Sequence, residues 1–353
     1  MNNTFGELFR ITTFGESHGA ALGVVIDGIP AGLEIDTAFL NSEMARRRPG
    51  QSDVSTARNE QDTPEILSGI FEGKATGTPL TIMIRNSNQH SSDYSGIKDI
   101  YRPGHADYTF EKKYGFRDYR GGGRSSGRET CARVAAGAIA KMLLRKFGIS
   151  VQACTIQVGS VKAEKRDWTC VENNVVRCAD PEAAEQMHNE IRIAAERCDS
   201  VGGMIHCEIL GLPAGLGEPV FDKFDALLAH AMLSIGGVKG FEIGSGFEAA
   251  ERYGSTNNDG MTPEGFLSNH AGGVLGGITN GNTVDFRIAV KPTPSVFIPQ
   301  RSIDRSGNAV EVNIRGRHDP CLVPRVVPVV EAMAALVTAD LLLRSRVNRL
   351  EQL

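Results

Sequence analysis

Aromatic residues are scarce, and the charge balance is slightly negative. Only 6% of the 353 residues are Phe, Trp or Tyr, so the chain offers few of the rings on which single-stranded nucleic acids stack. The formal net charge is −4, which gives no general attraction to a polyanion. A phosphate- or RNA-binding module is therefore disfavoured as an alternative, and a steep salt dependence of RNA binding would be its signature.

Metal, disulfide and targeting motifs are missing as well. The seven cysteines form no CxxC pair and leave one over in any full pairing. We interpret them as reduced thiols of a cytoplasmic protein, with no structural zinc. There is no HExxH and no GxxxxGK[ST]. The N-terminal residues do not resemble a signal peptide, and no apolar run approaches the length of a membrane span, so we expect neither a metal nor a membrane partner.

Glycine, in contrast, is abundant, with 40 residues in the chain. The densest stretch is RGGGRSSGRETCAR at 120–133, where Gly121 to Gly123 permit positive φ angles and close backbone approach. A helical pattern follows and stops before Gly148. A glycine-rich turn that leads into a helix N-terminus suits an anion. The arginines around it, Arg120, Arg124, Arg128 and Arg133, favour anion binding over a merely solvated helix start.

Strand and helix patterns alternate along the whole chain. Period-2 or short apolar runs predict strands at 22–27, 79–85, 150–160, 204–210, 284–290 and 309–315. Capping residues and 3.6-residue periods predict helices after Asp36, after Arg133, from Pro181, at 221–235 and at about 325–346. No repeat, linker or domain boundary is evident, so we expect a single domain over residues 1–353.

Several charged residues and histidines fall in turns. His18 lies between two glycines, His105 lies between Arg102 and Asp107, and His318 precedes Asp319. Such a set suits anion binding combined with proton transfer. The triplet Arg46 to Arg48 fits a solvated helix end and a ligand-binding role equally well. We interpret His188 and His206 as structural.

Six motifs, taken together and in order, resemble the chorismate synthase family. They are GESHG at 15–19, RPGHAD at 102–107, GGGRSSGRET at 121–130, SNHAGG at 268–273, KPTPS at 291–295 and RHDPC at 317–321. The resemblance runs from Phe5 to the last helix. It implies an α/β (α+β) fold, a β-α-β sandwich in which two antiparallel sheets enclose helices, usually assembled as a homotetramer.

The resemblance also implies a reaction. Members of the family are lyases that convert the small molecule 5-enolpyruvylshikimate 3-phosphate to chorismate and phosphate by trans-1,4-elimination. This is the last common step of the shikimate pathway to the aromatic amino acids. The family requires reduced FMN although the reaction is redox-neutral, and NADPH or an external flavin reductase is the possible source of electrons. A flavin oxidoreductase with net hydride transfer is the alternative enzyme class.

Site residues follow from the same resemblance. His18 would protonate the reduced flavin or its surroundings, His105 would face the leaving phosphate, and Asp319 would assist deprotonation at the flavin. The substrate's anionic groups would be held by Ser17, Arg47, Arg102, Arg128 and Arg317. Flavin contacts would fall at Arg124, Ser125, Ser126, Gly236, Gly237, Gly276, Lys291, Pro292, Thr293, Pro294, Ser295 and Arg317.

NADP contact is a further implication of the resemblance. Arg47 is its candidate residue, but Asp53 stands where the family commonly has a basic residue. That departure weakens the expectation of an intrinsic NADPH-dependent flavin reductase. Gly127, Gly236 and Gly237 stand where slightly larger residues are common, and we expect the core chemistry to tolerate them.

Overall fold

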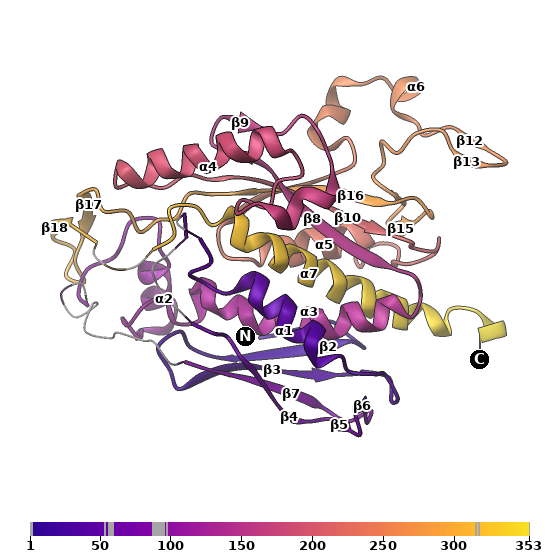
Figure 1. The fold of residues 1–353 in the computed structure, drawn as a ribbon, viewed down its shortest axis with the longest axis horizontal. Helices are drawn as coiled ribbons and strands as arrows, with labels where there is room; N and C mark the ends of the chain where they lie inside the picture. Colours follow the sequence, from indigo (N-terminus) through magenta and orange to yellow (C-terminus); the bar gives the residue numbers. More distant parts are fainter. Residues whose placement is uncertain are drawn as a thin grey trace.

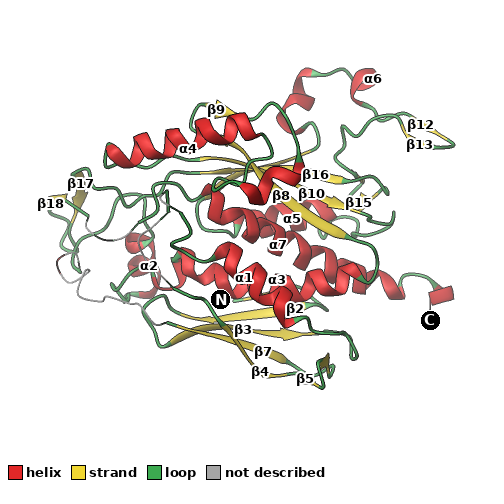
Figure 2. Ribbon diagram, viewed as in Figure 1, coloured by secondary structure: helices red, strands yellow, loops and turns green. Residues whose placement is uncertain are grey.

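Two five-stranded antiparallel sheets face each other across a layer of helices (Figures 1 and 2). The computed structural model describes residues 3–52, 54–55, 60–86, 96, 98–314, 316 and 318–352. Asp53 and Arg317, both named above, lie outside the described residues. The predicted sandwich of two antiparallel sheets around helices is confirmed.

The first sheet is built from the N-terminal quarter of the chain. Its strands run in the order β1 (Thr4–Phe5), β2 (Arg10–Gly15), β3 (Ala21–Asp27), β7 (Leu80–Arg85) and β4 (Pro64–Ser68). Alternate residues of β7, namely Leu80, Ile82 and Ile84, are buried, while their neighbours are partly exposed. This period-2 pattern shows that one face of the sheet covers the helices.

The second sheet comes from residues 150–290. Its order is β11 (Val238–Ile243), β16 (Val284–Val290), β10 (Gly203–Leu210), β8 (Ser150–Val158) and β9 (Val161–Lys162). Val284, Phe286 and Ile288 alternate toward the interior. The predicted strands at 150–160, 204–210 and 284–290 therefore form the centre of one sheet.

Four helices fill the space between the sheets: α1 (Thr37–Arg47), α3 (Thr130–Arg145), α5 (Phe224–Leu233) and α7 (Val323–Arg344). The helix α4 (Pro181–Glu196) lies on the outer side of the second sheet, and α2 (Asp107–Tyr114) lies at one end of the sandwich (Figure 1). Two predicted helix starts are confirmed. Asp36 accepts the N–H of Phe39 at 2.9 Å, and Asp180 accepts the N–H of Glu182 at 3.1 Å.

Short elements connect these layers. The small hairpins are β5 (Ile70–Phe71) with β6 (Lys74–Ala75), β12 (Met261–Thr262) with β13 (Gly265–Phe266), β14 (Val274–Leu275) with β15 (Ile278–Thr279), and β17 (Gln300–Ile303) with β18 (Ala309–Val312). The remaining helical pieces are η2 (Gly123–Ser125), η3 (Gly127–Glu129), η4 (Trp168–Asn173), η5 (Gly246–Glu251), α6 (Gly254–Asn257), η6 (Ser345–Val347) and η7 (Leu350–Gln352).

The helices α3 and α7 pack closely at the centre of the molecule. A Cβ atom on Gly137 would lie 2.4 Å from the Cβ of Ala332, so only glycine permits this approach. By length and composition, the segment Val323–Val347 is sufficient to cross a membrane, which corrects the expectation that no apolar run approaches that length. However, 94% of the most apolar stretch of this segment is buried inside the protein, as in a core helix.

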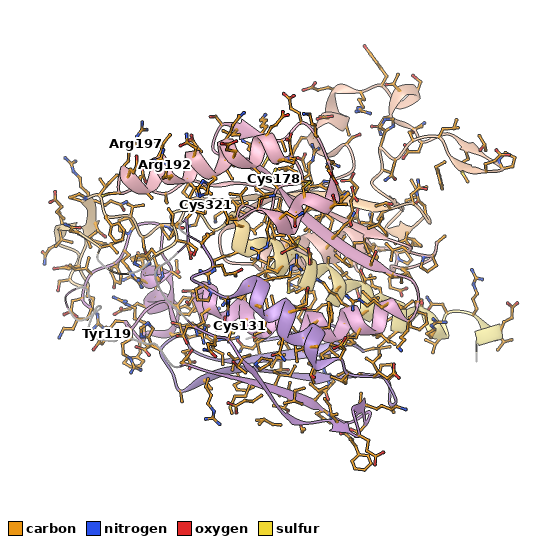
Figure 3. All side chains as sticks on the ribbon, viewed as in Figure 1. Tyr119, Cys131, Cys178, Arg192, Arg197 and Cys321 are labelled. Atoms are coloured by element: carbon orange, nitrogen blue, oxygen red, sulfur yellow. The ribbon has the colours of Figure 1, made fainter. Side chains whose placement is uncertain are left out.

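All seven cysteines lie within the described residues and are free thiols. Figure 3 labels Cys131, Cys178 and Cys321, which lie inside the body of the protein, whereas Arg192 and Arg197 lie at its surface near the end of α4. Burial raises the pKa of Cys131 to about 11 and that of Cys321 to about 12. Both thiols are therefore protonated at neutral pH, and a protonated thiol is a poor nucleophile.

Candidate functional site

A cavity of about 370 Å³ opens where the ends of α1, α3 and α7 meet several turns. Its size is that of a site for a small molecule. The predicted site residues that line it are Ser17, His18, Arg47, Arg102, His105, Ser125, Ser126, Arg128, Gly236, Gly237, Lys291, Thr293, Pro294, Ser295 and Asp319. Five of the six motifs therefore contribute to one cavity, although they are spread over 300 residues.

The glycine-rich turn separates the two predicted catalytic histidines. A Cβ atom on Gly121, which has φ +69°, would lie 2.6 Å from Cδ2 of His18 and 2.9 Å from Oγ of Ser17. A Cβ atom on Gly122 would lie 3.3 Å from Nε2 of His105. The glycines thus leave room for both imidazole rings, in addition to any close approach to a ligand.

Asp107 holds His105 and Arg102 together at the start of α2. Its carboxylate accepts from Nε of Arg102 at 2.7 Å and from Nη2 at 2.8 Å, and it lies 3.0 Å from Nδ1 of His105. Burial lowers the pKa of His105 and outweighs the opposing effect of Asp107. Because the ionised carboxylate can only accept, Nδ1 of the neutral ring carries the proton, and Nε2 is left as the acceptor.

Asp62 joins two further arginines of the cavity. Nη1 of Arg47 donates to Asp62 at 2.8 Å, and Nη1 of Arg128 donates to the other oxygen of the same carboxylate. Asp62 has φ 50°, an unusual backbone conformation for a residue with a side chain. Burial alone would raise the pKa of Asp62, but the two guanidinium groups outweigh it and lower that pKa. No local pattern in the sequence marked Asp62, because its partners lie 15 and 66 residues away.

The turn at 291–295 docks against the turn that carries His105. Nζ of Lys291 donates to the carbonyl oxygen of Gly104 at 2.7 Å. The hydroxyl oxygens of Thr293 and Ser17 are buried and have no hydrogen-bond partner among the described residues. Both line the cavity, so both are available to a ligand that can hydrogen-bond to a hydroxyl.

The N-terminal end of α7 closes another side of the cavity with Asp319 and Arg325. Nη1 of Arg325 donates to Oδ2 of Asp319. Arg325 was not predicted from the sequence, although a signal was present. A basic residue in the first turn of an apolar helix opposes the helix dipole and therefore calls for a specific reason.

Other predicted residues lie away from the cavity. Arg120 pairs with Asp118 at 2.7 Å, Arg124 donates to Thr13 at 2.6 Å, and Arg133 donates to Glu129 at 2.8 Å. Of the four arginines expected around the glycine-rich turn, only Arg128 lines the cavity. Two further predicted flavin contacts, Gly276 and Pro292, are not among the lining residues.

The arginine triplet divides by direction, as its helical spacing requires. Arg47 is 1% exposed and lines the cavity. Arg46 points into the helix layer, where Nη1 donates to Glu331 at 2.6 Å. Arg48 is exposed. Of the three arginines, Arg47 alone lines the cavity, and its role toward a ligand stays a prediction.

Buried guanidinium groups and titratable side chains converge on one cavity, an arrangement typical of enzymes that act on a small anionic molecule. A sequence model of the family described as "Chorismate synthase" matches residues 9–343. A chorismate synthase from Cytophaga hutchinsonii is 55% identical over 361 aligned positions, covering 99% of this chain and all of that protein. A crystal structure of chorismate synthase superposes with a TM-score of 0.77 at 32% identity, covering 99% of this chain and 96% of that one.

The chain therefore belongs to the chorismate synthase family, whose members are carbon–oxygen lyases of the shikimate pathway.

Proposed function

We propose that the cavity catalyses the trans-1,4-elimination of phosphate from 5-enolpyruvylshikimate 3-phosphate to give chorismate, with reduced FMN as cofactor. The observation that carries this proposal is the convergence of Ser17, His18, Arg47, Arg102, His105, Arg128 and Asp319 on one cavity. A substrate with a phosphate and two carboxylates needs preorganised positive charge of this kind.

The donor groups of the cavity fit FMN as well. The buried hydroxyl of Thr293 has no hydrogen-bond partner among the described residues, and a flavin mononucleotide carries many acceptors. The residues proposed to hold it are Ser125, Ser126, Gly236, Gly237, Lys291, Thr293, Pro294 and Ser295, all of which line the cavity. Reduced FMN, when bound, supplies an electron transiently that eases loss of the allylic phosphate.

The protein's own groups then stabilise the departing phosphate. Burial keeps His105 largely neutral before the ligand arrives. An approaching phosphate favours the protonated imidazole, since an opposite charge stabilises the charged form. We propose that His105 takes up its proton as the substrate binds and donates it from Nε2 to the leaving phosphate. Asp319 would assist deprotonation, and His18 would supply a proton near the flavin.

The decisive experiment is an anaerobic assay with purified protein, 5-enolpyruvylshikimate 3-phosphate and photoreduced FMN. Chorismate and phosphate are quantified against total reduced flavin. We expect many turnovers for each flavin and none with oxidised FMN. If one molecule of reduced flavin is instead consumed for each molecule of substrate converted, the protein is a flavin oxidoreductase, the alternative enzyme class.

The source of reduced flavin is open to the same assay. Arg47 is the one NADP candidate, and its N–H groups donate to Thr130, Asp62 and Gly127 within the protein. We therefore propose that an external reductase supplies reduced flavin in a cytoplasmic setting, in keeping with the seven free thiols. NADPH with oxidised FMN should then give no turnover until a separate flavin reductase is added.

A further inference from the structure

Three arginines of the cavity are held by internal acceptors. Arg47 donates from Nε, Nη1 and Nη2 to Thr130, Asp62 and the carbonyl of Gly127. Arg102 donates to Asp107 and to the carbonyl of Gly121. Their charges are balanced by carboxylates that are themselves buried.

Arg128 follows the same pattern. It donates to Asn86 and Asp62, and Glu60 lies 3.6 Å away. A ligand that binds these three arginines therefore competes with, or shares, acceptors that the protein already supplies.

Arg325 is different. Its Nη1 donates to Asp319, but its Nε is buried and has no hydrogen-bond partner among the described residues. The side chain is 18% exposed and lines the cavity. A buried N–H group without an acceptor is unfavourable, and a ligand oxygen would remove that penalty.

Two further features oppose the positive charge of Arg325, for which Asp319 is the anion already present. Arg325 lies in the first turn of the 22-residue helix α7, where the dipole is positive. The charge of Arg325 also contributes to the lowered pKa of Arg47, after the larger effect of burial, which shows that the two cations are near each other. A negative group near both arginines would offset the repulsion of Arg325 by the helix dipole and by Arg47.

We propose that Arg325 is a further ligand-binding residue of the cavity, which binds an oxyanion through Nε while Nη1 holds Asp319. The oxyanion is a carboxylate or phosphate of the substrate, or the phosphate of the flavin. This inference rests on the proposed function and extends it. Arg325 would also couple binding to orientation, because the same guanidinium fixes the carboxylate of Asp319.

The test compares Arg325→Gln and Arg325→Lys with a control on the same helix. Arg344→Gln removes an arginine at the far end of α7, where Asp222 lies 3.1 Å away and where the side chain does not line the cavity. Equilibrium binding of 5-enolpyruvylshikimate 3-phosphate, FMN and inorganic phosphate is measured together with kcat and KM. Thermal unfolding identifies any variant that fails to fold, in which case Arg325→Lys carries the comparison.

We expect Arg325→Gln to weaken the binding of at least one of these ligands by roughly 10- to 100-fold, the loss of one charge-assisted hydrogen bond. Arg325→Lys should recover part of the affinity, since it keeps the charge but loses the planar fork. Weakened substrate binding identifies a substrate oxyanion, and weakened FMN binding alone identifies the flavin phosphate. The control variant should bind all three ligands as the unmodified protein does.

A positioning role alone gives a different result. If Arg325 acts only through Asp319, Arg325→Gln will lower kcat with unchanged affinities, and it will have no effect in an Asp319→Asn background. That outcome would overturn the inference. Failure of the unmodified protein to turn over substrate would instead refute the proposed function, and inorganic phosphate would still test Arg325 as an oxyanion ligand.

Discussion

Asp107 orients two cavity side chains at once, so its substitution tests how the site is organised. We expect Asp107→Asn to lower the pKa of His105 further, because the protonated ring loses its acceptor while the positive charge of Arg102 remains. Turnover should fall by roughly 100-fold, the usual contribution of a positioned acid. NMR titration of ¹³C-labelled histidine, with His105→Asn for assignment, measures the shift.

The matched control for this change is Asp99→Asn. Asp99 is an exposed carboxylate in the neighbouring segment, 3.7 Å from Arg305. Its replacement should leave the His105 titration and the turnover unchanged. An unchanged or raised His105 pKa in Asp107→Asn would show that Asp107 does not favour the protonated ring.

Substitutions at Gly121 and Gly123 distinguish the effect of backbone strain from the effect of a steric clash. Gly121→Ala places a methyl group against His18 and Ser17, and we expect turnover to fall at least 100-fold. Gly123→Ala is the control, because Gly123 also has a positive φ of 51° but has open space where the methyl group would lie. Both changes should cost about 1 kcal/mol of stability through strain, measured by urea unfolding. Equal losses of turnover would contradict the steric explanation.

At the scale of elements, Glu331 ties three helices and a strand together. It accepts from Arg46 of α1 at 2.6 Å and from Lys141 of α3 at 2.6 Å, and it accepts the N–H of Ala153 of β8 at 3.1 Å. Burial acts to raise the pKa of Glu331, but the two cations outweigh it and lower the pKa to about 2. The network also fixes α1, which carries Arg47 into the cavity.

Glu331→Gln should therefore destabilise the protein by about 1.5–3 kcal/mol, because Arg46 and Lys141 lose a charged acceptor. Both cations keep Glu43 as a partner. The pH dependence has a defined sign. The folded pKa lies below the unfolded value of about 4.3, so the stabilisation is present above that value and is lost as the pH falls toward about 2. Urea unfolding between pH 3 and pH 7 should show a larger loss in the unmodified protein than in the variant, which keeps other carboxylates with a lowered pKa, such as Asp62.

Glu196→Gln provides the comparison for that series. Glu196 is 60% exposed and pairs with Arg192 one turn earlier on α4. Exposed pairs of this kind contribute about 0.3–0.5 kcal/mol. Similar losses in the two variants would mean that the buried network is worth no more than a surface pair.

The elements were largely predictable because their signals are local. Asp36 and Asp180 lie at their helix starts as the capping rule requires, and the apolar alternation of 284–290 forms β16. The boundaries of the elements were less predictable. The strand expected at 309–315, for example, has the range Ala309–Val312. The last helix was expected at about 325–346 and has the range Val323–Arg344. Its apolar run does reach the length of a membrane span, contrary to the expectation.

The site was predictable only in part, for a physical reason. Motif residues such as His18 and His105 could be named from the sequence, but which arginines meet in space depends on contacts between distant segments. Arg124 and Arg133 face the sheet and α5 instead of the cavity. Asp62 carries no motif of its own, so its importance becomes visible only when Arg47 and Arg128 are placed beside it. The sequence places Arg325 in the first turn of an apolar helix, but its contact with Asp319 depends on the fold.

At the scale of the whole molecule, an arm formed by residues 246–267 projects from the body and includes η5, α6, β12 and β13 (Figure 1). Four large apolar side chains on it are strongly exposed: Phe247 at 80%, Tyr253 at 82%, Met261 at 72% and Leu267 at 73%. Exposed apolar groups gathered on one segment indicate a contact surface. We expect this arm to hold the homotetramer that the family resemblance implies.

Light scattering after size exclusion should then give a mass near four times 38.0 kDa for the unmodified protein. Replacing Phe247 and Tyr253 together by serine removes most of the aromatic surface of the arm and should shift the protein to smaller species at micromolar concentration. The control is Phe71→Ser, a 69% exposed side chain on the β5–β6 hairpin, which should leave the mass unchanged. Dissociation caused by Phe71→Ser and not by the arm variant would place the contact at the hairpin, because an apolar side chain contributes to assembly only where a partner buries it.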